Sequence, residues 1–162
     1  GYQEMKRRLK QEGWDIELVV LLFANGATLN SDLIDHGIEI LRNDKSFDSA
    51  VTTSVYNMWS PLRARKLHTD GSLHPMVPFE TFGDPRTMNC DRDSQGDVHF
   101  ADMAVSVVRP ECLEKLDEGL LPQKWMGKRI APIPNWGGCD VDYEWQVPMV
   151  EFWLRKHGYQ DV

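Results

Sequence analysis

The sequence predicts an α/β fold of one domain with a mostly parallel sheet. Its 162 residues, 41% of them hydrophobic, are enough for one core and few for two. The segment 17–23, which is apolar at every position after Glu17, is typical of a strand that is buried on both faces, as in a parallel sheet. A loop and an amphipathic helix beginning near residue 30 follow this run, and 49–55 provides a returning strand. We therefore expect a right-handed crossover between these two strands.

Periodicity and turn residues predict the other elements. Residues 2–12 have helical spacing and are ended by Gly13, which indicates a surface helix. The stretch 56–89 is rich in prolines and aromatic residues and includes the turn signal Thr69-Asp70-Gly71-Ser72, so we expect an irregular excursion that contains a hairpin. The later elements are expected as strands at 102–108 and 129–133, a short helix at 110–118 and an amphipathic helix within 143–157.

Charge and cysteine content limit the class of protein. A balance of 18 basic against 25 acidic residues, a net charge of -7, argues against non-specific binding to nucleic acid or to an anionic membrane. The sequence has no apolar run near the ~20 residues of a membrane span and no basic-then-apolar leader. Cys90, Cys112 and Cys139 are odd in number and far apart, which argues against a disulfide scaffold and a cysteine zinc site. We therefore expect a soluble, cytoplasmic protein.

A pair of acids after a double glycine is the first candidate site. Gly137 and Gly138 allow a sharp turn, after which Asp140 and Asp142 lie two residues apart and so on one side of an extended segment. Two carboxylates that share a small volume repel each other unless water or a cation separates them, which makes a divalent metal the natural ligand. The alternative is that Asp142 caps the following helix while Asp140 is a solvated loop residue.

The loop after the first strand is the second candidate. Asn25 and Gly26 follow the strand at 17–23, and open α/β sheets bind ligands at the carboxyl ends of their strands. Asn25 can form hydrogen bonds, and Gly26 lets the backbone approach a ligand closely. An ordinary turn would use the same residue types. The sequence contains neither a GxGxxG fingerprint nor a GxxxxGK[ST] phosphate loop.

Cations near the middle of the chain are candidates for binding an anionic substrate. Arg63 and Arg65 follow the strand at 49–55, although a solvated face would also contain them. Residues 91–97, with Asp102, superficially match a calcium loop, but their flanks and two ligand positions do not, so we interpret them as a solvated acidic turn. Arg92 in this turn could bind a carboxylate or phosphate with both arms of its guanidinium group. The five histidines show no metal-ligand spacing.

Several of these segments together resemble the CMP-sugar synthetases, the cytidylyltransferases of acylneuraminate and related acidic sugars. The matching segments are the apolar strand with its loop and helix, the strand SAVTTSV, the turn Asp70-Gly71-Ser72-Leu73-His74-Pro75, an arginine before a strand, and Asp140-Val141-Asp142 before a helix with Glu151. The similarity spans nearly the whole chain but only the C-terminal two-thirds of such an enzyme.

This resemblance implies a Rossmann-like three-layer sandwich of the nucleotide-diphosphosugar transferase type, with a hairpin excursion and assembly into a homodimer. It implies transfer of CMP from CTP to an acidic sugar or similar anionic acceptor, with Mg²⁺ as cofactor and release of pyrophosphate. Asp140 and Asp142 fall on the metal-binding Asp-x-Asp of the family, and Arg92 falls on an arginine near the acidic sugar.

The chain also departs from the family pattern. The glycine-rich, basic loop that holds the triphosphate is absent, and Phe23-Ala24-Asn25-Gly26-Ala27-Thr28-Leu29 replaces a Gln-Pro-Thr-Ser-Pro-Leu-Arg type of stretch. Gln146 stands where an aspartate is usual, and Pro148 lies near the start of the last helix. We therefore expect this polypeptide alone not to turn over CTP. The alternative function is a non-catalytic binding or dimerisation module.

Overall fold

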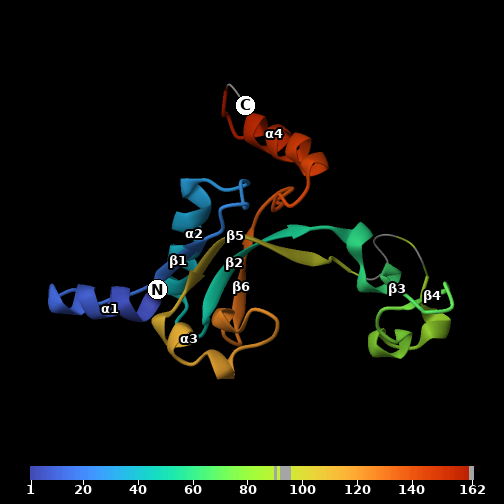
Figure 1. Cartoon of the computed structure of the whole chain (residues 1–162), viewed down its shortest axis with the longest axis horizontal. Helices are drawn as coiled ribbons and strands as arrows, with labels where there is room; N and C mark the ends of the chain where they lie inside the picture. Colours follow the sequence, from blue (N-terminus) through green and yellow to red (C-terminus); the bar gives the residue numbers. More distant parts are fainter. Residues whose placement is uncertain (90, 92–95, 161–162) are drawn as a thin grey trace. The chain divides into compact units, whose positions relative to one another are not determined.

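The computed structural model of the chain describes residues 1–89, 91 and 96–160. The chain forms two compact units (Figure 1). Unit 1 comprises Gly1–Ser54 and Ala101–Val162, and unit 2 comprises Val55–Phe100.

A four-stranded mixed sheet is the centre of unit 1. It consists of β1 (Val19–Leu22), β2 (Ser49–Val55), β5 (His99–Val108) and β6 (Ile130–Pro134), in the order β1-β5-β2-β6. β1 is antiparallel to β5, with Leu22 opposite Val105, whereas β2 is parallel to β6. The sheet is mostly antiparallel, so the expected Rossmann-like sandwich with a mostly parallel sheet is wrong.

The error concerns β1 and β2, the strands before and after the helix that begins near residue 30, which we expected to be joined by a crossover within a parallel sheet. β5 lies between β1 and β2, so these two strands are not neighbours. β1 is at the edge of the sheet, and its Val20 and Leu22 are exposed instead of buried on both faces. An apolar run of strand length shows that a strand is present, but it does not reveal the direction of the strand that pairs with it.

The helix between β1 and β2 was predicted correctly and covers the core. α2 (Ser31–Asn43) is capped by Asn30, whose side-chain oxygen accepts a hydrogen bond from the Leu33 amide at 3.0 Å. Its apolar face packs on alternating strand residues, as the helical and strand periodicities require. The buried core cluster consists of Leu41, Ala50, Val105, Val107, Ala131 and Ile133.

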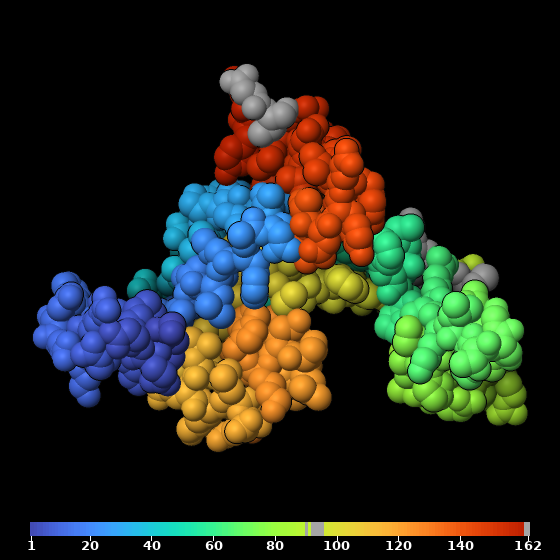
Figure 2. All heavy atoms as spheres, viewed as in Figure 1, coloured from blue at the N-terminus to red at the C-terminus, as the bar shows by residue number. Residues whose placement is uncertain are grey.

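The other helices of unit 1 lie close to their expected positions (Figure 1). They are α1 (Tyr2–Gln11), α3 (Pro110–Glu114) and α4 (Val147–Lys156). α4 buries Val150 and Trp153 but exposes Val147, Met149 and Phe152. The C-terminal segment that includes α4 is orange to red in Figure 2. Within the described residues, every helix is too short or too polar to cross a membrane.

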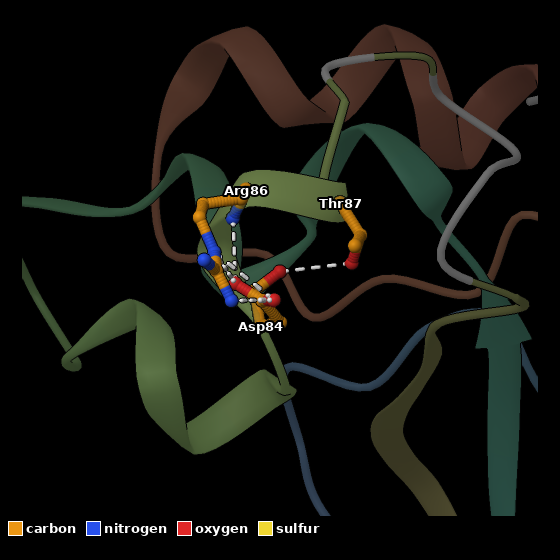
Figure 3. A network of polar contacts seen from close by, with 3 residues as sticks. All are labelled: Asp84, Arg86 and Thr87. Carbon is orange, nitrogen blue, oxygen red and sulfur yellow. Dashed lines mark hydrogen bonds and ion pairs between the residues drawn. The ribbon is translucent and has the colours of Figure 1, made fainter.

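Unit 2 contains the hairpin that the turn residues predicted. β3 (Arg65–Leu67) and β4 (Leu73–Pro75) pair as an antiparallel ladder. Short 3-10 turns supply much of the remaining structure, and one of them is held by Asp84 (Figure 3). The Arg86 guanidinium donates from Nη2 to Asp84 Oδ2 at 2.7 Å, and Thr87 Oγ1 donates to the Asp84 carbonyl at 2.9 Å. These contacts are exposed, so they order the turn locally and add little to stability.

Candidate functional site

The candidate site lies at one edge of the sheet in unit 1, namely the edge formed by the carboxyl ends of β1, β2 and β6. β2 and β6 are parallel, and the backbone amide of Asn135, just after β6, donates to the Thr53 carbonyl near the end of β2 at 2.8 Å. β5 runs antiparallel to β1, so Asp102, which precedes the paired residue Val105, lies beyond the carboxyl end of β1. The ends of three strands and the first half of β5 therefore contribute to the same edge.

Two loops far apart in the sequence are joined at this edge. The Val141 amide donates to the Asn25 carbonyl at 2.8 Å, and Asn25 Nδ2 donates to Asp142 Oδ1 at 3.2 Å. Thr28 is fully buried, and its Oγ1 accepts from the Cys139 amide at 3.0 Å and donates to the Cys139 carbonyl at 3.3 Å. The loop after β1 and the segment that contains the acid pair thus form one structure.

A buried carboxylate, that of Asp102, stabilises this structure through hydrogen bonds. Asp102 is only 6% exposed, and its carboxylate accepts hydrogen bonds from Thr52 Oγ1, from Ser54 Oγ at 3.2 Å and from Asn135 Nδ2 at 3.2 Å. The Ala104 amide donates a further bond at 3.1 Å. Four donors compensate for the loss of water around the carboxylate, which would otherwise make its burial costly.

The same network fixes the double-glycine turn. The Gly138 amide donates to Ser54 Oγ at 2.8 Å, and the single hydroxyl hydrogen of Ser54 is shared between the Asn135 carbonyl, 2.8 Å away, and the Asp102 carboxylate, 3.2 Å away. A Cβ atom on Gly138 would lie 1.9 Å from Asp102 Oδ2, so only glycine fits this position without a shift. The turn therefore has a defined position relative to the sheet, and the two acids follow it immediately.

The acid pair is available for a ligand. Asp140 is half-buried, and within the described part of the chain no hydrogen-bond donor reaches its carboxylate. Asp142 is exposed and accepts from Asn25, while its backbone amide donates to Gln146 Oε1 at 2.7 Å. Asp142 does not cap a helix, because the first turn begins after Tyr143. The helix-cap alternative is therefore wrong, whereas the metal role of the pair stays a prediction.

Gly26 has a packing role in the structure. A Cβ atom there would lie 3.0 Å from the Cα atom of Ala104 on β5, so the missing side chain lets the loop lie against the sheet. Binding of substrate by Asn25 and Gly26 stays a prediction.

Two of the predicted arginines, Arg63 and Arg65, belong to unit 2, and the third is not among the residues that the structure describes. Arg65 Nη1 donates to the carbonyls of Leu62 and Ala64 at 2.7 and 3.0 Å, and its guanidinium lies 5.4 Å from the centre of the Phe79 ring. Arg63 is exposed. Arg92 is outside the described residues. An anion-binding role for these three residues stays a prediction.

Two features escaped the sequence interpretation. Asp102 was assigned to a solvated acidic turn but is buried, and the signal for this was an acid at the start of an otherwise apolar strand. His68, Asp70 and His74 form a compact cluster, although the histidines had shown no metal-ligand spacing. Their six-residue separation becomes meaningful only once the hairpin register is known.

Cys139, beside the acid pair, is not a poised nucleophile. Burial raises the pKa of its thiol, and the negative charges of Asp140 and Asp102 add to this effect. The uncharged thiol is the weaker nucleophile and the weaker metal ligand. Cys139 therefore serves the site through its backbone contacts with Thr28.

Two surface pockets of unit 1 are lined by other residues. One, of about 310 Å³, includes Asp48, Cys112 and Lys128, and the other, of about 350 Å³, includes Lys6 and Trp14. The Asp48 carboxylate already accepts the backbone amides of Lys128 and Arg129. Neither pocket contains a residue of the acid pair or its network, so hydrogen bonding and not cavity shape identifies the candidate site.

Comparisons with known proteins leave the family open. No model of a known protein family matches the chain, and no curated protein sequence matches it.

Proposed function

We propose that the chain is a cytidylyltransferase that transfers CMP from CTP to an acidic sugar or similar anionic acceptor, with Mg²⁺ bound by Asp140 and Asp142. The observation that carries the proposal is the contact between the loop after β1 and the acid pair, through the hydrogen bond from Asn25 to Asp142. Ligand sites of open α/β sheets lie at strand ends, and carboxylates can hold the metal ion that accompanies nucleotide phosphates. This contact, which brings a strand-end loop next to two carboxylates, therefore supports the proposal.

The donor set suits a hard cation. Mg²⁺ prefers oxygen ligands and is commonly bound through one or two carboxylates, with water and substrate phosphates completing its shell. Among the described residues, no third side chain with metal-binding chemistry completes a compact cluster with Asp140 and Asp142. The pair therefore fits a metal that is shared with the phosphates of a nucleotide, and it does not fit a closed structural site.

Each residue has a distinct part in the proposed reaction. The acceptor hydroxyl oxygen attacks the α-phosphorus of CTP, pyrophosphate leaves with the electron pair of the broken P–O bond, and the hydroxyl proton passes to solvent. Bound Mg²⁺ neutralises charge on the phosphates. Asn25 holds Asp142 by its hydrogen bond, while Asp102 positions the preceding turn through Ser54.

Calorimetric titration of the chain with CTP in the presence of Mg²⁺ tests this proposal. Asp140→Asn and Asp142→Asn each keep the side-chain volume but remove a negative charge, and each is expected to weaken binding by at least about tenfold. Asp117→Asn is the matched control, because this aspartate is fully exposed and lies outside the site. Binding of CTP that is the same in all three variants would remove the metal role of the pair.

The reaction itself needs a second measurement. A pyrophosphate-release assay with CTP, Mg²⁺ and a series of sugar acids tests turnover. Because the glycine-rich triphosphate loop of the family is absent from these residues, we expect binding of CTP without release of pyrophosphate by this polypeptide alone. Release of pyrophosphate that depends on both acids would contradict this expectation and would show that the residues present suffice for the transfer.

A second candidate function, a homodimeric assembly module, is favoured by the surface around α4. Exposed aromatic side chains are concentrated in this part of the chain, and they are Trp136, Tyr143, Trp145 and Phe152. Trp136 and Phe152 lie with ring centres 5.8 Å apart, and Tyr143 and Trp145 stack at 6.2 Å. Exposed aromatic clusters are typical of association surfaces.

Sedimentation equilibrium tests the homodimer. Phe152→Glu places a charge in the cluster and should shift a dimer toward monomer, whereas Leu120→Glu alters a leucine of equal exposure, 52%, elsewhere in unit 1. A monomeric wild-type chain would overturn the assembly function.

A further inference from the structure

The tip of the hairpin in unit 2 brings three metal-binding side chains together. Lys66 on β3 is paired with His74 on β4, and beyond the last strand pair the His68 amide donates to the Ser72 carbonyl at 2.9 Å. Alternate residues of a strand point to the same face, so His68 lies on the face of Lys66 and is a diagonal neighbour of His74. The register alone therefore places the two imidazoles side by side.

The side chains of His68, Asp70 and His74 lie close together. The imidazole rings of His68 and His74 stack with their centres 3.7 Å apart and their planes inclined by 20°. Asp70 lies in the turn between them, and one ligand atom from each of the three residues lies within 4.8 Å of the other two. All three residues are exposed, and the green hairpin segment lies at the surface in Figure 2.

Ser72 ties the cluster together. Asp70 Oδ1 accepts from the Ser72 amide at 2.9 Å and from Ser72 Oγ at 2.6 Å, and Ser72 Oγ lies 3.0 Å from His74 Nε2. The carboxylate and one imidazole are therefore held near each other before any ligand arrives.

Unit 2 has little buried apolar surface, so a bound metal ion would add to its stability. Among its described residues no apolar side chain is buried, and Leu67 and Leu73, the closing pair of the hairpin, are 68% and 66% exposed. A segment with so little buried apolar surface gains little from the hydrophobic effect. Small structural elements of this kind are commonly stabilised by a bound metal ion.

From these observations we propose that His68, Asp70 and His74 bind a first-row transition metal ion, with Zn²⁺ as the expected ion, and that this metal stabilises the hairpin. Two imidazole nitrogens and one carboxylate oxygen match the ligands of zinc, whereas Mg²⁺ and Ca²⁺ prefer oxygen alone. Zinc lies about 2.0–2.2 Å from such ligands, so side-chain rotations would have to bring the three atoms closer together than the 4.8 Å that now spans them, and water would take a fourth position. This site is independent of the proposed nucleotide site.

Titration of the whole chain with Zn²⁺ tests the proposal. The wild-type chain should bind one Zn²⁺ at this site, and His68→Ala and His74→Ala should each weaken that binding by at least about 100-fold. Ser72→Ala removes only the group that orients the ligands and should weaken binding by about 10–100-fold. His36→Ala is the matched control, because His36 is an exposed histidine on α2 and should leave the affinity unchanged.

Two further measurements separate this site from others. Co²⁺ absorption should lack thiolate charge-transfer bands, because the proposed ligands include no cysteine. Hydrogen exchange should show Zn²⁺-dependent protection of the hairpin amides in the wild type and in His36→Ala, but not in His68→Ala. Equal Zn²⁺ affinity in His68→Ala and the wild type, or thiolate bands in the Co²⁺ spectrum, would overturn the assignment. Tight binding without protection of the hairpin would overturn the stabilising role.

Discussion

Gly138→Ala is the most direct test of the buried network under the acid pair. The added Cβ would lie 1.9 Å from Asp102 Oδ2 and 2.5 Å from Asn135 Nδ2, well inside van der Waals contact. Gly138 does not have a positive φ, so the cost comes from these contacts and not from the backbone conformation. Overpacking a rigid site costs roughly 1–3 kcal/mol, and a shifted turn would lose the bond from Gly138 to Ser54, about 1 kcal/mol more. We expect a destabilisation of roughly 2–4 kcal/mol.

Urea unfolding of a graded series measures this cost. A Cβ on Gly26 would approach the Ala104 Cα to 3.0 Å, and a Cβ on Gly1 would meet nothing within 4 Å. The loss of unfolding free energy should therefore be largest for Gly138→Ala, smaller for Gly26→Ala and within about 0.5 kcal/mol of zero for Gly1→Ala.

A double-mutant cycle identifies the group that causes the clash. In the background of Asp102→Ala the carboxylate is absent, so Gly138→Ala should cost less than in the wild type, by about 1 kcal/mol or more. If Gly138→Ala alone were as stable as the wild type, the close approach of the turn to Asp102 would be refuted. Additive effects in the cycle would refute the role of the carboxylate.

Three further predictions concern charged or titratable groups. Asp102→Asn keeps the shape of the side chain but presents an amide to several donors, so it should lower the free energy of unfolding by roughly 1–3 kcal/mol in urea, and an unchanged value would contradict the acceptor role. Hydrogen bonds from Arg7 and Arg8 lower the pKa of Glu4 from 4.5 to about 2, so its support of α1 is complete above pH 4.5 and is lost as the pH falls toward 2; an NMR titration of the carboxyl group that gave its ordinary pKa would contradict the pairing. Burial raises the pKa of Cys139, so alkylation by iodoacetamide near neutral pH should be slower in the folded chain than in urea, and equal rates would show an accessible thiol.

Local elements could be predicted because their signals are local. The strand at Ser49–Val55 has the predicted bounds, and α2 begins after its asparagine cap, since the cap and the periodic apolar face act within a few residues. The hairpin followed from turn residues for the same reason. The order of strands is different, because the antiparallel insertion of β5 between β1 and β2 depends on contacts between distant segments. No residue pattern within β1 distinguishes an edge strand from a central one.

The same distinction between local and long-range signals applies to the residues of the candidate site. Asp140 and Asp142 stand out because their spacing and the preceding glycines are adjacent in the sequence. Asp102 could be assigned only once β5 was paired, since its donors come from β2, from the segment after β6 and from its own strand. His68 and His74 become neighbours through the hairpin register. Residues whose role depends on a partner in another strand are those that a single sequence reveals least.

The predicted site and the incorrect sheet are compatible for a topological reason. Ligand sites in open α/β sheets lie where the carboxyl ends of parallel strands meet. Here β2 and β6 run in parallel and the loop after β1 contacts the segment that follows β6, so these ends still share an edge although β5 lies between β1 and β2. Because β5 is antiparallel to β1, it enters the sheet from this edge and places Asp102 beneath the double-glycine turn. The inserted strand thus supplies the buried carboxylate that positions the acid pair, which a purely parallel sheet would have had to obtain from another element.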